Sequence, residues 1–320
     1  MRRFRAALLT AVLLVGLAAC DSGDAGETFT LAFLRALPTG GNDVFLDEMA
    51  AGGFIVGENL RILGEDPEEA YPDPESAKVA VERWVDQGVD LIVAFSTSGA
   101  DAARQVTDTV PILFLVNDPM AVGLVEDEQR PEANLTGVTF RAPADRTLEL
   151  VRAALPGLST VGVLSAAADP ATPAATATIG AAAEEAGVTV VSASFPDDAG
   201  VEAAVATLAE AGVDAVYLAN APTVIRSLSV IEPTVAAAGL PLVTNTDLAQ
   251  TVLVGLTPDA DSLLAQLGRQ AARILDGAKV SSVPVEDPRS FRLVLGASQA
   301  RILGLGELPV TLTRQADEVR

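Results

Sequence analysis

The 320-residue sequence contains no histidine, one cysteine (Cys20) and two lysines (Lys78 and Lys279). Catalytic triads and proton shuttles that use imidazole, zinc sites built from cysteine and histidine, and disulfides within the chain are therefore excluded. Chemistry that pairs a serine with a lysine would have to use Lys78 or Lys279, and neither lysine lies in a recognisable spacing motif with a serine. We expect no metal, no cofactor and no enzymatic activity.

Positive charge is scarce as well. Lys and Arg together number 21 against 43 Asp and Glu, which gives a formal net charge of −22. The field of such a protein repels DNA and RNA, so we expect no nucleic acid among its partners. Apolar residues make up 49% of the chain, and a typical domain has about 100–200 residues. The sequence is therefore long and apolar enough for two domains, each with its own core.

A long apolar run occurs only at the N-terminus. Three arginines within the first five residues precede a largely apolar run over residues 6–19. This run is shorter than the roughly 20 residues of a membrane span and has the length typical of a signal peptide. A small-residue, polar segment follows over residues 21–26.

The run ends in Leu17-Ala18-Ala19-Cys20, which resembles the lipobox of bacterial lipoproteins. In that family the chain is cut before the cysteine, and the thiol is acylated. The resemblance predicts a lipoprotein signal peptide over residues 1–19, lipidation of Cys20 and a tether over 20–27. The protein would then lie outside the cytoplasm, in the cell envelope, anchored to the membrane through lipid. A simple secretory signal with a chance cysteine, or a cytosolic protein with an apolar N-terminus, is the alternative.

The rest of the chain alternates short apolar segments with longer segments rich in Ala, Glu and Leu. The pattern predicts strands over residues 28–34, 59–63, 89–94, 110–116, 160–164, 188–193, 214–218 and 240–244. Helices are predicted over residues 42–52, 73–87, 98–107, 145–155, 174–186, 198–211 and 223–238. Strands without polar alternation that are each followed by a helix indicate parallel sheets covered on both faces. The predicted strands and helices fall into two blocks of sequence, which meet near residues 134–143.

The last part of the chain contains further elements: strands are predicted over 252–256 and 290–295, and helices over 259–276 and 298–303. The second block alone cannot easily accommodate all of these elements. We therefore expect the chain to return to the first block and cross again. The predicted fold is α/β, with two Rossmann-like lobes whose parallel sheets are joined by hinge strands. Lobe one comprises residues 28–138 and 257–280, and lobe two comprises 139–256 and 281–320. The expected hinges are residues 136–141, 253–257 and 277–283.

Open α/β sheets bind ligands at the carboxyl ends of their strands, so polar residues just after the predicted strands are candidate ligand contacts. In lobe one Arg35 follows the first strand, and Ser96, Thr97 and Ser98 open a helix, where hydroxyl and N–H groups suit a carboxylate. These three residues could equally serve only as helix caps. Asp118 either caps the next turn or pairs with a ligand cation such as an ammonium group.

In lobe two the corresponding candidates are Ser165, Asn220, Thr223 and Asp247. Short polar groups that converge on one place can hold a small zwitterion without chemical change. Few aromatic side chains are available to stack on a ligand; Phe33, Phe95, Phe114 and Tyr217 lie near strand ends and serve either this purpose or the core. Sugar is therefore a weaker ligand prediction than an amino acid.

Residues 112–138 (ILFLVNDPMAVGLVEDEQRPEANLTGV) resemble the central motif of the ABC-transporter substrate-binding lipoproteins of the tryptophan/tyrosine-binding type. That motif is an apolar strand followed by T-D-P-V-x-A-G-L-V and P-G-G-N-x-T-G-V. Asn117 replaces its first threonine, and Glu132-Ala133 replaces its Gly-Gly. Further matches are found at residues 154–159, 267–277, 283–286 and 291–294.

The resemblance implies a type I periplasmic-binding-protein fold. It also implies that the protein, as a monomer, binds a small ligand such as an amino acid, aromatic ones included. Its partners would be an ABC permease and the permease's ATPase. Two alternatives remain open: a module of the same fold that senses a ligand for a signalling partner, and an anchored hydrolase with a pair of carboxylates among the 43 acidic residues.

Overall fold

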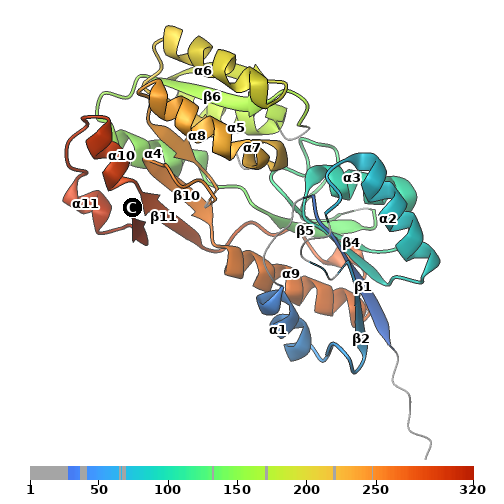
Figure 1. Ribbon diagram of the computed structural model, residues 1–320. Coiled ribbons are helices and arrows are strands. Elements are labelled where there is room, and N and C mark those ends of the chain that lie inside the picture. Colours follow the sequence, from blue (N-terminus) through green and yellow to red (C-terminus); the bar gives the residue numbers. More distant parts are fainter. Residues whose placement is uncertain are drawn as a thin grey trace, which may run out of the picture.

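The computed structural model describes residues 28–36, 42–64, 66, 70–131, 133–169, 172–218, 221–246 and 248–320. The predicted signal peptide, Cys20 and the tether lie outside these ranges. The described residues form two α/β lobes, which confirms the predicted fold class (Figure 1). Within the described part of the chain, no helix combines the length and the apolar character that crossing a membrane requires.

The sheet of lobe one has the strand order β2-β1-β3-β4-β5, and its neighbouring strands pair in parallel. Its strands are β1 (Phe29–Leu34), β2 (Leu60–Leu63), β3 (Leu91–Ala94), β4 (Ile112–Val116) and β5 (Leu135–Thr139). Its helices are α1 (Asp43–Ala51), α2 (Pro74–Asp86), α3 (Thr97–Val106) and α9 (Ala260–Leu275).

Alternation along β1 shows why both faces of this sheet are covered. Leu31 and Phe33 pack in one cluster with residues of α1 and α9, whereas Ala32 and Leu34 pack in another with residues of α2 and α3. All four side chains are buried. Because successive side chains of a strand point to opposite faces, a continuously apolar strand requires helices on both sides of the sheet.

The sheet of lobe two has the order β12-β11-β10-β9-β8-β6-β7. Its strands are β6 (Thr160–Ala166), β7 (Thr189–Phe195), β8 (Ala215–Leu218), β9 (Leu242–Thr244), β10 (Val254–Pro258), β11 (Phe291–Leu295) and β12 (Glu318–Val319). β10 and β11 pair antiparallel, and the other neighbours pair in parallel. The sheet is therefore mixed, whereas the sequence predicts a parallel sheet in this lobe.

Helices cover both faces of this sheet too. They are α4 (Ala144–Ala154), α5 (Thr172–Glu185), α6 (Val201–Glu210), α7 (Pro222–Arg226), α8 (Leu228–Ala237), α10 (Ala297–Ile302) and α11 (Val310–Thr313), with 3-10 turns η1 (Asp198–Gly200) and η2 (Val280–Ser282) elsewhere in the chain. Residues of α4, α5, α10 and α11 pack on one face, and residues of α6, α7 and α8 pack on the other. The helix predicted over 223–238 is interrupted at Ser227.

The chain passes between the lobes at three places. It leaves lobe one after β5, returns from β10 into α9, and crosses again before β11. The third crossing comes later than expected: Thr136 Oγ1 donates to the Val283 carbonyl at 2.7 Å, and Glu286 forms a bridge with Val138. Residues 283–287, which the sequence assigned to lobe two, thus run beside β5 of lobe one.

An arginine on the first crossing connects it with the third. Arg141 donates through Nη2 to both carboxylate oxygens of Glu128, at 2.9 and 2.8 Å, and lies 2.9 Å from Asp287 Oδ1. Thr139 Oγ1 donates to the same oxygen of Asp287 at 2.7 Å. Desolvation by burial acts to lower the pKa of Arg141, but the two carboxylates outweigh it and raise the pKa. These contacts therefore hold the first and third crossing segments in a defined position relative to each other.

An aspartate in the sequence Gly-Val-Asp has the same role in both lobes. In lobe one the backbone N–H of Thr30 donates to Asp90 Oδ2 at 2.7 Å. In lobe two the backbone N–H groups of Ser159 and Thr160 donate to Asp214 Oδ2 at 2.7 and 2.8 Å, and the Ser159 hydroxyl donates at 2.9 Å. Each aspartate precedes one strand and binds the start of its neighbour.

The hydrogen bonds to Asp214 make lobe two sensitive to acid. Desolvation alone would raise the pKa of Asp214, but donation from the Ser159 and Thr160 backbone and the Ser159 hydroxyl lowers it below its ordinary value. A carboxyl group whose pKa is lower in the folded than in the unfolded state stabilises the fold above the unfolded pKa of about 3.9. That stabilisation is lost as the pH falls through the lower, folded-state pKa.

We expect Asp214→Asn to lower the free energy of unfolding at neutral pH by about 1–3 kcal/mol, because a neutral amide oxygen accepts these hydrogen bonds less strongly. The difference from the wild type should shrink as the pH falls from about 4 through the lower folded-state pKa, because the wild-type carboxyl group then becomes neutral as well. Urea unfolding measured across this pH range checks the prediction. Asp108→Asn, at an exposed loop position, is the control. An equal difference at every pH would contradict the account.

Candidate interlobe ligand site

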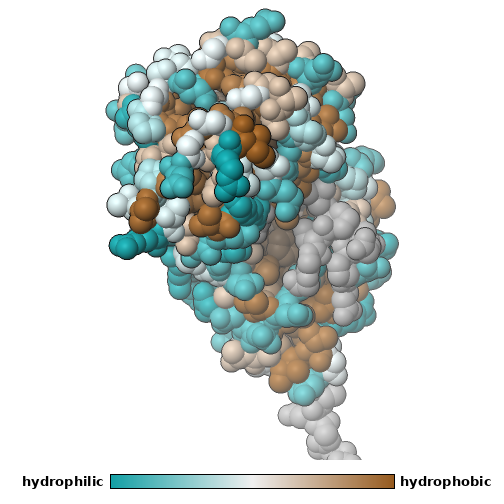
Figure 2. Space-filling view, turned by 60° about the vertical axis from the view of Figure 1, so that its left-hand side comes forward, coloured by the Kyte–Doolittle hydropathy of each residue, from teal (hydrophilic) through white to brown (hydrophobic). Residues whose placement is uncertain are grey.

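A cleft of about 910 Å³ lies between the two lobes. Its lining comes from both lobes and from the crossing segments, so neither lobe forms the site alone. Apolar side chains lie in the recess between the lobes (Figure 2). A volume of roughly 300–1,000 Å³ with mainly apolar walls is typical of sites for small organic ligands.

Arg35 is the most buried charged group of this cleft. It directly follows β1, so the strand delivers it to the carboxyl edge of the sheet, and it is 1% exposed. Its Nη1 donates to the Gly64 carbonyl at 2.7 Å, and its guanidinium carbon lies 4.7 Å from the Phe33 ring centre and 5.6 Å from that of Phe95. Among the described residues, Nε and Nη2 have no hydrogen-bond partner. Desolvation by burial lowers the pKa of Arg35.

The N-terminus of α3 lies on the same side of the cleft. Ser96 is its N-cap and accepts the Gly99 N–H at 3.0 Å through Oγ, so this serine does cap the helix as the sequence suggested. Thr97 and Ser98 line the cleft within the first turn. This turn carries no acidic residue, so the partial positive charge of the helix N-terminus is not offset locally.

Lobe two contributes an acid that the sequence analysis missed. Asp169 lines the cleft three residues after β6 and is 6% exposed. Thr223, at the start of α7, also lines the cleft, and its N–H lies 3.5 Å from Asp169 Oδ2. Arg226 lines the cleft as well and donates to Thr223 Oγ1 at 3.2 Å. Asp169 follows the strand predicted over residues 160–164, which is the signal that could have identified it, but the sequence analysis names Ser165 as the ligand contact after that strand.

The predicted site residues separate into three groups. Arg35, Ser96, Thr97, Ser98 and Thr223 are brought together along the cleft. Asp118 and Ser165 are not among its lining residues: Asp118 Oδ1 accepts the Ala121 N–H at 3.0 Å and so caps its turn, and the Ser165 hydroxyl lies 3.5 Å from the Ala193 carbonyl. Asn220 and Asp247 lie outside the described residues.

The aromatic candidates differ in place. Phe95 lines the cleft, and Phe33 is buried beside Arg35. Phe114 and Tyr217 lie in the cores of the two lobes, where burial raises the pKa of Tyr217. Phe140, on the first crossing, lines the cleft although the sequence analysis did not single it out. Phe95 and Phe140 are therefore the aromatic rings that a ligand would meet.

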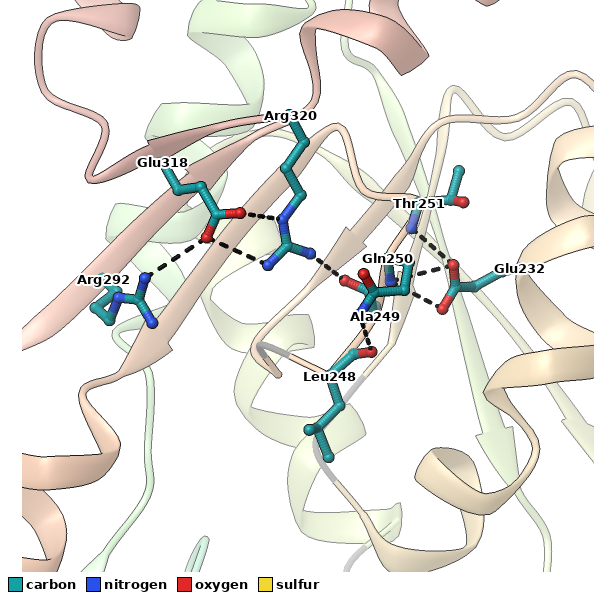
Figure 3. Close-up of polar contacts among 8 residues, drawn as sticks. All are labelled: Glu232, Leu248, Ala249, Gln250, Thr251, Arg292, Glu318 and Arg320. Atoms are coloured by element: carbon teal, nitrogen blue, oxygen red, sulfur yellow. Dashed lines mark hydrogen bonds and ion pairs between the residues drawn. The ribbon is translucent and has the colours of Figure 1, made fainter. Parts of the chain in front are cut away.

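The segment over residues 248–251 begins with Leu248, a cleft residue that is 53% exposed. Figure 3 shows how this segment is held. The Glu232 carboxylate on α8 accepts the Thr251 N–H at 2.7 Å and the Gln250 N–H at 3.0 Å, and Arg320 Nη1 donates to the Ala249 carbonyl at 2.6 Å. These contacts determine where Leu248 stands at the edge of the cleft.

The charged groups of the cleft suit binding better than catalysis. Asp101 uses Oδ1 to accept from Arg104 at 2.8 Å and Oδ2 to accept from Gln105 at 2.6 Å, so its oxygens are already engaged. Across the ranges that the structure describes, no group of three or more Cys, Asp or Glu is arranged to hold a metal ion. The two buried charged groups among the described cleft residues are the Arg35 cation in lobe one and the Asp169 carboxylate in lobe two.

The comparisons with known proteins agree with this geometry. Residues 47–320 match the model of the family "ABC transporter substrate binding protein". A protein of Clostridioides difficile (strain R20291) named "Tyrosine-binding protein" is 23% identical over 267 residues, which cover 82% of this chain and 76% of that protein.

Two solved structures have the same fold. One is a conserved domain protein of Vibrio cholerae, 23% identical, with a TM-score of 0.81 and coverage of 92% of this chain and 99% of that one. The other is an ABC domain of Streptococcus pneumoniae in complex with L-Trp, 22% identical, with a TM-score of 0.82 and coverage of 92% and 100%.

We expect Glu232→Gln to loosen the Leu248 segment without unfolding lobe two, because the amide oxygen accepts the Gln250 and Thr251 N–H groups more weakly than a carboxylate. The free energy of unfolding should fall by about 1 kcal/mol. Amide hydrogen exchange of residues 250 and 251 should become faster, while exchange in β6 and β8 stays unchanged. Glu58→Gln, at an exposed turn, is the matched control. Unchanged exchange at residues 250 and 251 would contradict this role for Glu232.

Proposed function

Because the chain belongs to the ABC transporter substrate-binding protein family, we propose that it binds a small zwitterion, such as an amino acid, in the interlobe cleft. It then delivers this ligand, unchanged, to an ABC permease and its ATPase. Binding at the cleft and release at the permease require lobes that move about hinges and contacts of modest strength, rather than reactive groups.

The observation that carries this proposal is a buried cation on one wall of the cleft and a buried carboxylate on the other. The cation of Arg35 is buried in lobe one, and the carboxylate of Asp169 is buried in lobe two. An amino acid carries a carboxylate and an ammonium group on adjacent positions, so it can interact with both walls and favour the closed arrangement. A sugar offers neither charge.

The apolar walls accommodate a large side chain on the ligand. Leu115, Phe95 and Phe140 lie on one side of the cleft, and Ile225 and Leu248 lie on the other. The C. difficile relative named as tyrosine-binding and the S. pneumoniae structure with L-Trp support an aromatic amino acid as the ligand of this chain too.

A thermal-shift panel tests the proposal directly. Amino acids, with Trp, Tyr and Phe among them, should raise the unfolding temperature, because a ligand that binds only the folded state stabilises it by RT ln(1 + [L]/Kd). At a concentration of 100 times Kd this stabilisation is about 2.7 kcal/mol. Glucose, myo-inositol and adenine serve as matched non-zwitterionic controls. A shift with a sugar or a nucleobase and with no amino acid would refute the proposed ligand class.

We further propose that Cys20 is acylated and anchors the protein to the outer side of the cytoplasmic membrane, close to the permease. The lipobox resemblance of residues 17–20 supports this. In a bacterial host, the wild type should incorporate labelled fatty acid and sediment with membranes, whereas Cys20→Ser should do neither. Membrane association that persists in Cys20→Ser without label would indicate another kind of anchor.

A further inference from the structure

We propose that the side of the Arg35 guanidinium formed by Nε and Nη2, together with the N-terminus of α3, is the carboxylate-binding subsite of the cleft. This inference rests on the proposed function and assigns one end of the ligand to one place in lobe one. The partner that Nε and Nη2 lack among the described residues is then the carboxylate of the ligand.

The pattern of hydrogen bonds on Arg35 is the first argument. Nη1 is engaged with the Gly64 carbonyl at 2.7 Å, whereas Nε and Nη2 are buried with no partner among the described residues. The N–H groups of Nε and Nη2 point in the same direction from the planar guanidinium. Such a fork matches the two oxygens of a carboxylate in a bidentate pair.

The surroundings hold this fork in one orientation. The guanidinium carbon lies over the Phe33 ring at 4.7 Å and the Phe95 ring at 5.6 Å, so the cation contacts two aromatic side chains. Arg35 also lines the cleft. A buried cation held by two rings and one carbonyl, with two donors pointing the same way, has little freedom left to lose when an anion binds.

The register of the sheet brings the second element beside Arg35. Leu34 of β1 pairs with Ala94 of β3, and the Phe95 N–H donates to the Leu34 carbonyl at 2.9 Å. Arg35 and Phe95, the residues that follow the two strands, therefore leave the sheet side by side, and Ser96, the N-cap of α3, comes directly after Phe95. The first-turn N–H groups of Thr97 and Ser98 have no acceptor within the described ranges, as expected at a helix N-terminus that can bind an anion.

A buried charge with one hydrogen bond lowers the stability of the protein that carries it. Replacing such a group by an apolar side chain of similar size is often neutral or stabilising. The ligand carboxylate compensates the charge, so the same residue that weakens the unliganded protein strengthens the complex. An arginine that destabilises the unliganded protein but stabilises the complex is thereby distinguished from a structural arginine, which stabilises the protein without ligand.

The test compares Arg35→Met, Arg35→Lys and the exposed control Arg61→Met with the wild type, by calorimetric titration and thermal unfolding. The amino acid selected in the panel should bind Arg35→Met at least about 30-fold more weakly, as expected when one partner of a buried charged pair is removed. Arg35→Lys should not restore the affinity, because an ammonium group lacks the fork. Without ligand, Arg35→Met should unfold at the same or a higher temperature.

The wild type is also tested with analogues, so the inference does not depend on the variants folding. The decarboxylated amine of the selected amino acid should bind at least about 30-fold more weakly than the parent amino acid. If the amine binds as tightly, or if Arg35→Met keeps the parent affinity, the subsite assignment is wrong. A lower unfolding temperature of Arg35→Met without ligand would mean that Arg35 is structural.

Failure of the proposed function gives a different result. If no amino acid binds, 3-phenylpropionate and acetate probe the subsite alone, since they carry a carboxylate without an ammonium group. A thermal shift with 3-phenylpropionate in the wild type, absent in Arg35→Met, would support the subsite and reject the zwitterion. No shift with any carboxylate would reject the subsite itself, and a shift with inorganic phosphate alone would assign the fork to another anion.

Discussion

A guanidinium removed from water, with no anionic partner among the residues that the structure describes, is the constraint around which the cleft is built. Arg35 is 1% exposed, donates to a single carbonyl within the described part of the chain, and contacts two phenylalanine rings. Buried charges are normally paired, because the cost of desolvation otherwise remains uncompensated. A fold tolerates such a group most readily where a ligand completes it, and here the group lies at the opening between two lobes.

The two lobes place this cation and its counterpart by the same means. In each lobe parallel strands end at the cleft, so a residue that follows a strand lines the cleft in both lobes: Arg35 directly after β1 and Asp169 three residues after β6. The carboxylates of Asp90 and Asp214 bind the starts of neighbouring strands at the opposite ends of the sheets. The repeated structural unit thus separates positions that stabilise a sheet from positions that line the cleft.

The proposed uptake of a ligand requires connections between the lobes that let the walls approach each other. The chain crosses three times, and Arg141 joins the first crossing to the third through Asp287 and to lobe one through Glu128. Neither lobe encloses the cleft, so a ligand that interacts with both walls shifts the lobes toward closure by its difference in affinity for the two arrangements. For the proposed zwitterion, the buried cation of Arg35 and the buried carboxylate of Asp169 would provide that difference.

Much of the fold could be predicted from the sequence because apolar strands and capped helices leave strong local patterns. The element over Leu135–Thr139 was missed, since a short segment with glycine and two threonines resembles a linker; its pairing with β4 depends on tertiary contacts. β12 has only two residues, and its pairing with β11 also depends on tertiary contacts, so a sequence pattern could not identify it. Position after a strand identified Arg35, but it could not distinguish Ser165, which faces the β7 backbone, from Asp169, which faces the cleft.

A crystal structure of the protein with its bound amino acid tests the central claim most directly. The account predicts ligand density between the lobes, with the carboxylate within hydrogen-bond distance of Arg35 Nε and Nη2 and the ammonium group on the side of Asp169. Density outside the cleft, or a ligand in the cleft whose carboxylate faces lobe two while Arg35 stays without an anion, would contradict it.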